Sequence, residues 1–73
     1  MTRDEILRHL ERLLEVVPNS LSGNERLSGI PAWDSIAVLA FVTTTEEIWG
    51  ILLDAEQVSG CQTVNDLLTL VRV

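Results

Sequence analysis

A long irregular segment separates two strongly helical patterns in this chain and limits the folds open to it. The segment runs from Pro18 to Trp33 and is rich in glycine, proline, serine and asparagine, which favour loops. The chain has only 73 residues, enough for one domain spanning residues 1–73. Loops this long are usually functional or disordered, and here we expect an ordered loop that packs over the core. Its apolar contacts would come from Leu21, Leu27, Ile30 and Trp33.

The residues before this loop predict a first helix from Arg3 to Val17, which Pro18 ends. Thr2 and Glu5 are spaced as a capping box, in which each side chain bonds the other residue's backbone N–H. Apolar residues recur at helical spacing and define one buried stripe. The stripe consists of Ile6, Leu7, Leu10, Leu13, Leu14 and Val17.

A second helix is expected from Ser35 to Trp49, because Gly50 is a typical residue just beyond a helix end. Asp34 and Ser35 are both good N-cap residues, and the sequence does not decide between them. The threonines at 43–45 are expected to bond their hydroxyls back to the preceding turn. The predicted buried face holds Val38, Val42, Thr45 and Trp49, with Phe41 beside them.

Two shorter helices complete the predicted all-α fold. The third starts at Asp54, whose side chain can cap it, and ends near Gly60. The last begins at Thr63, with Asp66 three residues further on in the capping position. Strands are not expected, because aromatic residues make up only 4% of the chain and no long alternating apolar and polar run occurs. The last helix is predicted to bury Val64, Leu67, Leu68 and Val71.

The two tryptophans are expected to fix how these elements pack. Trp33 should pin the loop beside Ser35. Trp49 should close the second helix against the first and last helices. Its predicted partners are Leu10, Leu14, Val17 and Leu67.

The net charge of −6 is unevenly distributed, since no cation occurs from Leu27 to Val71. An acidic surface repels phosphate backbones, which argues against a nucleic-acid partner. It attracts proteins with basic patches and speeds their encounter. We therefore expect a monomer that meets basic partner proteins.

Two observations predict a cytoplasmic location. Cys61 is the only cysteine and cannot form an internal disulfide, which fits a reducing compartment. No basic and then apolar leader follows Met1, and the longest apolar run, Ile36–Val42, is too short to span a membrane. We expect neither secretion nor membrane insertion.

The dipeptide Asp34–Ser35 is the candidate functional site. A serine at the start of a helix is exposed where free N–H groups and the helix dipole favour anions, so a phosphodiester on its oxygen would be stabilised. Asp34 could offer its carboxylate to a modifying enzyme or to that enzyme's metal ion. Taken alone, such a dipeptide is in most proteins an ordinary helix cap.

The surrounding residues give Asp34–Ser35 a more specific meaning, because the sequence resembles the acyl carrier protein family from Ile6 to Val71. That family has an Asp-Ser-Leu motif at the start of its second helix. The matching stretches here are Leu27-x-x-Ile30-x-x-Trp33, Trp33-Asp34-Ser35-Ile36, Glu46-Glu47-Ile48-Trp49-Gly50-Ile51 and Thr63-Val64-x-Asp66-Leu67.

The resemblance implies a small four-helix bundle of acyl-carrier type that performs no catalysis itself. Ser35 would receive a covalent 4′-phosphopantetheine arm from coenzyme A through a phosphopantetheinyl transferase, and Asp34 would serve transferase recognition. The thiol of the arm, rather than Cys61, would carry acyl or aminoacyl groups as thioesters. Acyl-loading and acyl-processing enzymes of fatty-acid, polyketide or related biosynthesis would bind the carrier. The partner-binding residues implied are Ile36, Glu46, Glu47 and Asp54.

The sequence departs from the family pattern in three places. Ile36 replaces the usual leucine, and the turns from Ile36 to Ala40 carry no acid. Thr45 stands where the family often has a larger apolar residue. The change to Ile36 is mild, whereas the other two departures favour a dedicated carrier in a specialised pathway over a general fatty-acid carrier.

A small acidic helical module that binds other proteins without a prosthetic group is the alternative. It explains the acidic helices but leaves the displayed Ser35 unexplained. No spacing typical of metal ligands or of a nucleophile with its base is present. We interpret Cys61 as a small loop or core residue and His9 as a partly exposed helix residue.

Overall fold

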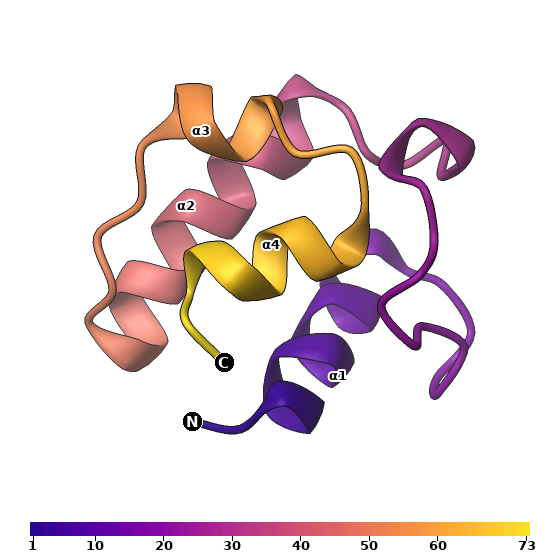
Figure 1. The fold of residues 1–73 in the computed structure, drawn as a ribbon, viewed down its shortest axis with the longest axis horizontal. Helices are drawn as coiled ribbons and strands as arrows, with labels where there is room; N and C mark the ends of the chain where they lie inside the picture. Colours follow the sequence, from indigo (N-terminus) through magenta and orange to yellow (C-terminus); the bar gives the residue numbers. More distant parts are fainter.

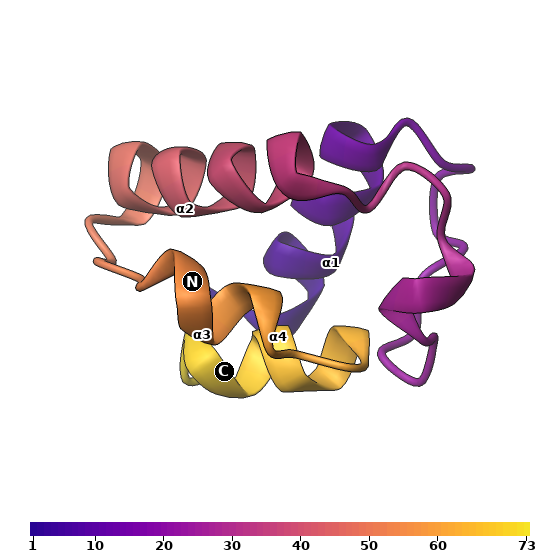
Figure 2. The same ribbon diagram turned by 90° about the horizontal axis from the view of Figure 1, so that it is seen from above.

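The computed structural model describes all 73 residues and consists of four α-helices and a short 3₁₀ helix, without strands (Figure 1). Seen from above, α2 lies on one side of the molecule and α3 with α4 on the other, while α1 crosses between these levels (Figure 2). The two chain ends lie close together, and α2 begins on the far side from them (Figure 1). The elements are α1 (Arg3–Leu14), η1 (Leu27–Gly29), α2 (Ser35–Trp49), α3 (Ala55–Ser59) and α4 (Val64–Leu70).

The helix starts follow the capping residues, as predicted. Thr2 and Thr63 each form a complete capping box, with Glu5 and Asp66 respectively. Asp54 caps α3 by accepting the N–H of Glu56 at 2.8 Å. These side chains satisfy N–H groups that a helix leaves unbonded in its first turn.

The predicted end of α1 at Val17 is wrong, because the helix ends at Leu14. Glu15 adopts a left-handed conformation with φ 55° and closes the helix with its own N–H. Pro18 also disfavours helical geometry at the residue before it. Val17 is therefore 71% exposed and does not belong to the buried stripe.

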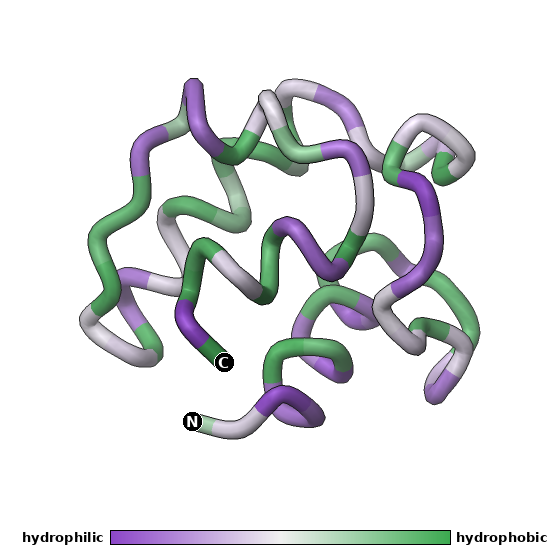
Figure 3. Tube along the Cα trace, viewed as in Figure 1, coloured by the Kyte–Doolittle hydropathy of each residue, from purple (hydrophilic) through white to green (hydrophobic).

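One hydrophobic core joins all four helices and the loop. The four residues predicted as the buried face of the last helix are buried as expected. The connection from Ile51 to Leu53 is also hydrophobic (Figure 3), and its first and last residues pack against the core while Leu52 is exposed. The core consists of Ile6, Leu7, Leu10, Leu21, Leu27, Val38, Phe41, Val58, Val64, Leu67, Leu68 and Val71.

The loop after α1 packs on the core through its apolar residues, as predicted. Leu21 and Leu27 are buried, whereas Ile30 and Trp33 are partly buried against the core. Backbone hydrogen bonds also tie the loop to the start of α4: the N–H of Leu27 donates to Gln62 O at 2.9 Å, and the isolated bridge Arg26–Thr63 lies beside it. The sequence contained no clear signal for this bridge or for η1.

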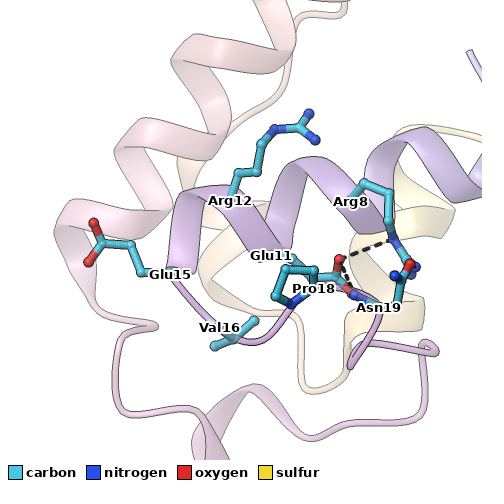
Figure 4. Close-up of a pocket in the computed structure, with 7 residues that line it drawn as sticks. All are labelled: Arg8, Glu11, Arg12, Glu15, Val16, Pro18 and Asn19. Atoms are coloured by element: carbon cyan, nitrogen blue, oxygen red, sulfur yellow. Dashed lines mark hydrogen bonds and ion pairs between the residues drawn. The ribbon is translucent and has the colours of Figure 1, made fainter.

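Glu11 organises the beginning of the loop, and the sequence did not mark it. Its side chain is only 3% exposed, and its carboxylate accepts the N–H groups of Asn19, drawn in Figure 4, and of Leu21, both at 2.9 Å. Arg8 Nε lies 3.1 Å from the same carboxylate. Burial alone would raise the pKa of Glu11, but these N–H bonds, together with Arg8 and Arg12, outweigh it and lower the pKa. Glu11 is therefore a charged anchor for the loop.

A second anchor lies at Gly23, where the loop meets α1 and α4. Arg3 Nη2 donates to Ser22 O at 2.9 Å and to Asn65 Oδ1 at 2.6 Å, and the N–H of Asn65 donates to Gly23 O at 2.8 Å. Gly23 has φ 120°, and a Cβ there would collide with the side chains of Arg3 and Asn65. Only glycine fits this close approach without strain.

Candidate functional site

Ser35 is the first residue of α2, and its side chain is free. The carboxylate of Asp34 accepts the N–H of Ala37 at 2.9 Å, so Asp34 is the residue that caps the helix. Ser35 is exposed, and its hydroxyl has no hydrogen-bond partner. Because Asp34 performs the capping, the Ser35 hydroxyl remains available for chemistry.

The backbone around Ser35 favours a negatively charged group. The N–H of Val38 donates to Asp34 O at 3.0 Å, whereas the N–H groups of Ser35 and Ile36 have no acceptor in the protein. Both lie at the positive end of a helix of 15 residues. A phosphate bonded to the Ser35 oxygen would thus be placed in a stabilising field.

The outer face of α2 carries apolar residues near Ser35 and acids further along. Ile36 and Leu39 are 75% and 59% exposed. Glu46 and Glu47 are also exposed, and helical spacing places all four on one face. Asp54 is exposed too, but it caps α3 rather than belonging to α2. The structure therefore brings Ile36, Glu46 and Glu47 onto one helix face, and adds Leu39, which the sequence analysis did not single out.

Four rings follow one another along the inner side of α2, and we call them the aromatic row: Phe41 and Trp49 of α2, Trp33 just before this helix, and His9 of α1. Ring centroids of Trp33 and Phe41 are 6.4 Å apart, and those of Phe41 and His9 are also 6.4 Å apart. His9 and Trp49 meet edge to face at 5.3 Å. The contact with Phe41 confirms that Trp33 pins the end of the loop beside Ser35.

His9 was predicted to be partly exposed, and this is wrong, because its side chain is only 7% exposed. Its Nε2 lies 2.8 Å from Thr44 Oγ1, whose hydroxyl already donates to Ala40 O at 2.7 Å. The single hydroxyl proton is thus used, so Nε2–H of His9 is the donor. Burial, followed by the charge of Arg12, lowers the pKa of His9 and keeps it neutral.

The expected bonding of the threonine hydroxyls to the preceding turn is confirmed for two of the three. Thr44 donates to Ala40 O, and Thr45 donates to Phe41 O. The predicted contact of Trp49 with Val17 is wrong, since Val17 is exposed beyond the end of α1, whereas Trp49 contacts His9.

An open hollow of about 380 Å³ adjoins Trp33 and has a mixed polar and apolar lining. Cys61 lies in this lining, but its thiol donates to Gln57 O at 3.4 Å, and burial followed by the charge of Asp66 raises its pKa. A thiol with a raised pKa is a weak nucleophile, in agreement with a structural role. The lining consists of Arg26, Leu27, Ser28, Trp33, Ser59, Cys61 and Gln62.

The hollow at the end of α1, drawn in Figure 4, has a volume of about 500 Å³. Its buried carboxylate, that of Glu11, is already bonded to two backbone N–H groups. This carboxylate therefore serves to hold the loop in place. No group of three histidine, cysteine, aspartate or glutamate side chains is placed to hold a metal ion, and no helix has the length and apolar character needed to cross a membrane.

Comparison with known proteins adds no relative: no family model matches the chain, and neither the curated proteins nor the solved structures give a match.

Proposed function

We propose that this chain is an acyl carrier protein of four-helix type whose Ser35 bears a 4′-phosphopantetheine arm. The observation that carries the proposal is the free, exposed Ser35 hydroxyl at the start of α2, next to an Asp34 that performs the capping in its place. The motifs that resemble the family fall on the elements expected of them, with the serine at the first residue of the second helix.

The residues fit the group. The Ser35 oxygen is open to a transferase, and the free N–H groups of Ser35 and Ile36 favour a phosphate on that oxygen. When bound, the arm supplies a thiol that carries an acyl or aminoacyl group as a thioester. The chain itself holds the arm and presents a surface to the transferase and to acyl-loading and acyl-processing enzymes.

The exposed face of α2 supports this partner role. Ile36 and Leu39 offer an apolar contact beside Ser35, and Glu46 and Glu47 offer charges to basic patches. The same face also favours the second candidate, a helical interaction module without a prosthetic group. The two functions differ in one respect, which is whether Ser35 is modified.

Incubation of the purified protein with coenzyme A and a broad-specificity phosphopantetheinyl transferase, followed by intact-mass measurement, separates them. We expect one phosphopantetheine on the wild type and on Ser28→Ala, which removes an exposed loop serine as a matched control. We expect none on Ser35→Ala, which keeps its Asp34 cap and should retain wild-type circular dichroism. An unmodified wild type with several transferases would leave the interaction module as the better function.

A further inference from the structure

The space beneath α2 is filled by the aromatic row. Phe41 at its centre has no exposed surface and is the largest fully buried side chain of the protein. The ring centroids of Trp33 and His9 each lie 6.4 Å from that of Phe41, and Trp49 in turn contacts His9. Protein cores are close-packed, so a further chain can enter here only if these rings move.

Hydrogen bonds hold the residues of this region in place. His9 donates to Thr44 across the contact between α1 and α2, and the fully buried Thr45 hydroxyl donates to Phe41 O. A hydrocarbon chain offers no partner to an imidazole or a hydroxyl. Displacing these groups would leave buried polar atoms unbonded, so the interior of this protein is a poor site for a long alkyl chain.

A hollow at the surface, beside Trp33, differs from this closed interior. It is open, and its lining includes the polar side chains of Arg26, Ser28, Ser59 and Gln62 beside apolar ones. These side chains can donate hydrogen bonds to carbonyl, hydroxyl or amide groups. A small polar group can thus be held at the surface without any change in the core.

We propose that the cargo of this carrier is a short or polar acyl group, of acetyl or aminoacyl size, held at the surface and not inserted between the helices. This inference rests on the proposed function. It assigns to Phe41 and its neighbours in the aromatic row the role of closing the interior to long alkyl chains.

The test loads Ser35 from acetyl-coenzyme A or octanoyl-coenzyme A with a broad-specificity transferase, with intact mass confirming each product. Urea unfolding is then followed by circular dichroism, and thioester cleavage by hydroxylamine is followed by mass. For the wild type, we expect the same unfolding midpoint and the same cleavage rate with either acyl group. A higher midpoint and slower cleavage with octanoyl would overturn the inference, because both report a sheltered chain.

Phe41→Ala provides the matched variant, because it removes the ring that fills the space. Its octanoyl form should unfold at a higher urea concentration than its acetyl form, and equal midpoints would overturn the role given to Phe41. If this variant does not fold, Phe41→Leu serves in its place. If the proposed function is wrong, the result differs, because neither acetyl-coenzyme A nor octanoyl-coenzyme A would then increase the mass of the protein. That result would overturn the inference about the cargo as well.

Discussion

The Nε2–H of His9 donates to the hydroxyl of Thr44 at 2.8 Å and thereby joins α1 to α2 inside the protein. The acceptor is fixed because Thr44 already gives its own proton to Ala40 O. On its other side, His9 lies edge to face with Trp49. A neutral imidazole supplies the one N–H that this hydrogen bond needs. A protonated imidazole would add an N–H at Nδ1 inside the protein and a positive charge close to Arg12.

We predict that acidification from about pH 7 to pH 5 weakens the fold through His9. The pKa of His9 is lower in the folded protein than its ordinary value of about 6.5, so the unfolded chain binds more protons in this range. The free energy of unfolding therefore falls as the pH drops below about 6.5, until the folded pKa is passed. Urea unfolding at a series of pH values measures this slope.

His9→Gln is the control, because glutamine can still donate to Thr44 but does not titrate. The free energy of unfolding of the variant should be lower by about 0.5–1.5 kcal/mol at pH 7, because the edge-to-face contact with Trp49 is lost. Its stability should then stay nearly level between about pH 7 and pH 5, since carboxyl groups titrate mainly below this range. An equal slope in both proteins would assign the pH dependence to other groups.

Glu11 provides a second prediction, on the loop. Glu11→Gln loses the charge that faces Arg8 and leaves one of the N–H groups of Asn19 and Leu21 facing an NH2 group, without an acceptor. We expect a loss of about 1–3 kcal/mol in the free energy of unfolding. Amide hydrogen exchange at Asn19 and Leu21 should accelerate. Glu15→Gln, at an exposed position on the same turn, should change stability by less than about 0.5 kcal/mol.

His9 and Glu11 also show which features of the fold could be predicted from the sequence and which could not. The ends of α2 and the start of α4 were predictable because Asp34, Gly50 and Thr63 act within one turn of their own position. The burial of Glu11 depends on the loop returning to α1, a tertiary contact that carries no local signal. Glutamate is rarely found fully buried and histidine is intermediate in burial, so nothing local indicated that these two side chains lie inside the protein.

The candidate site likewise has features that could be predicted from local sequence and features that required the structure. The placement of Ser35 at the helix start is local and could be read from the sequence. The assignment of the cap to Asp34 required the bond to Ala37 N–H. The early end of α1 depends on a left-handed Glu15, a conformation that glycine or asparagine adopts more often.

The third prediction concerns association with basic partners. Reversing Glu46 and Glu47 to lysine should lower the association rate with a phosphopantetheinyl transferase, the partner that the proposed function implies, by about tenfold at low ionic strength, because opposite charges steer the encounter. The difference should shrink as salt screens the charges. Stopped-flow measurement over a salt series tests this.

Asp4→Lys with Glu15→Lys is the matched control for that charge reversal. It changes the net charge equally but places the new charges on or beside α1. If the control associates as slowly as the Glu46 and Glu47 variant, only the net charge matters. If neither variant associates more slowly than the wild type, Glu46 and Glu47 take no part in steering partners.

The closeness of the two chain ends, on the far side from the start of α2, has a practical consequence for how the protein can be attached to other bodies (Figure 1). A flexible linker at either end leaves the helix start that bears Ser35 pointing away from the anchor. The protein can therefore be immobilised on a sensor or joined to a larger enzyme through one end without blocking access to that serine. Linkers at both ends would emerge side by side, so the domain could be inserted as a loop into a host protein.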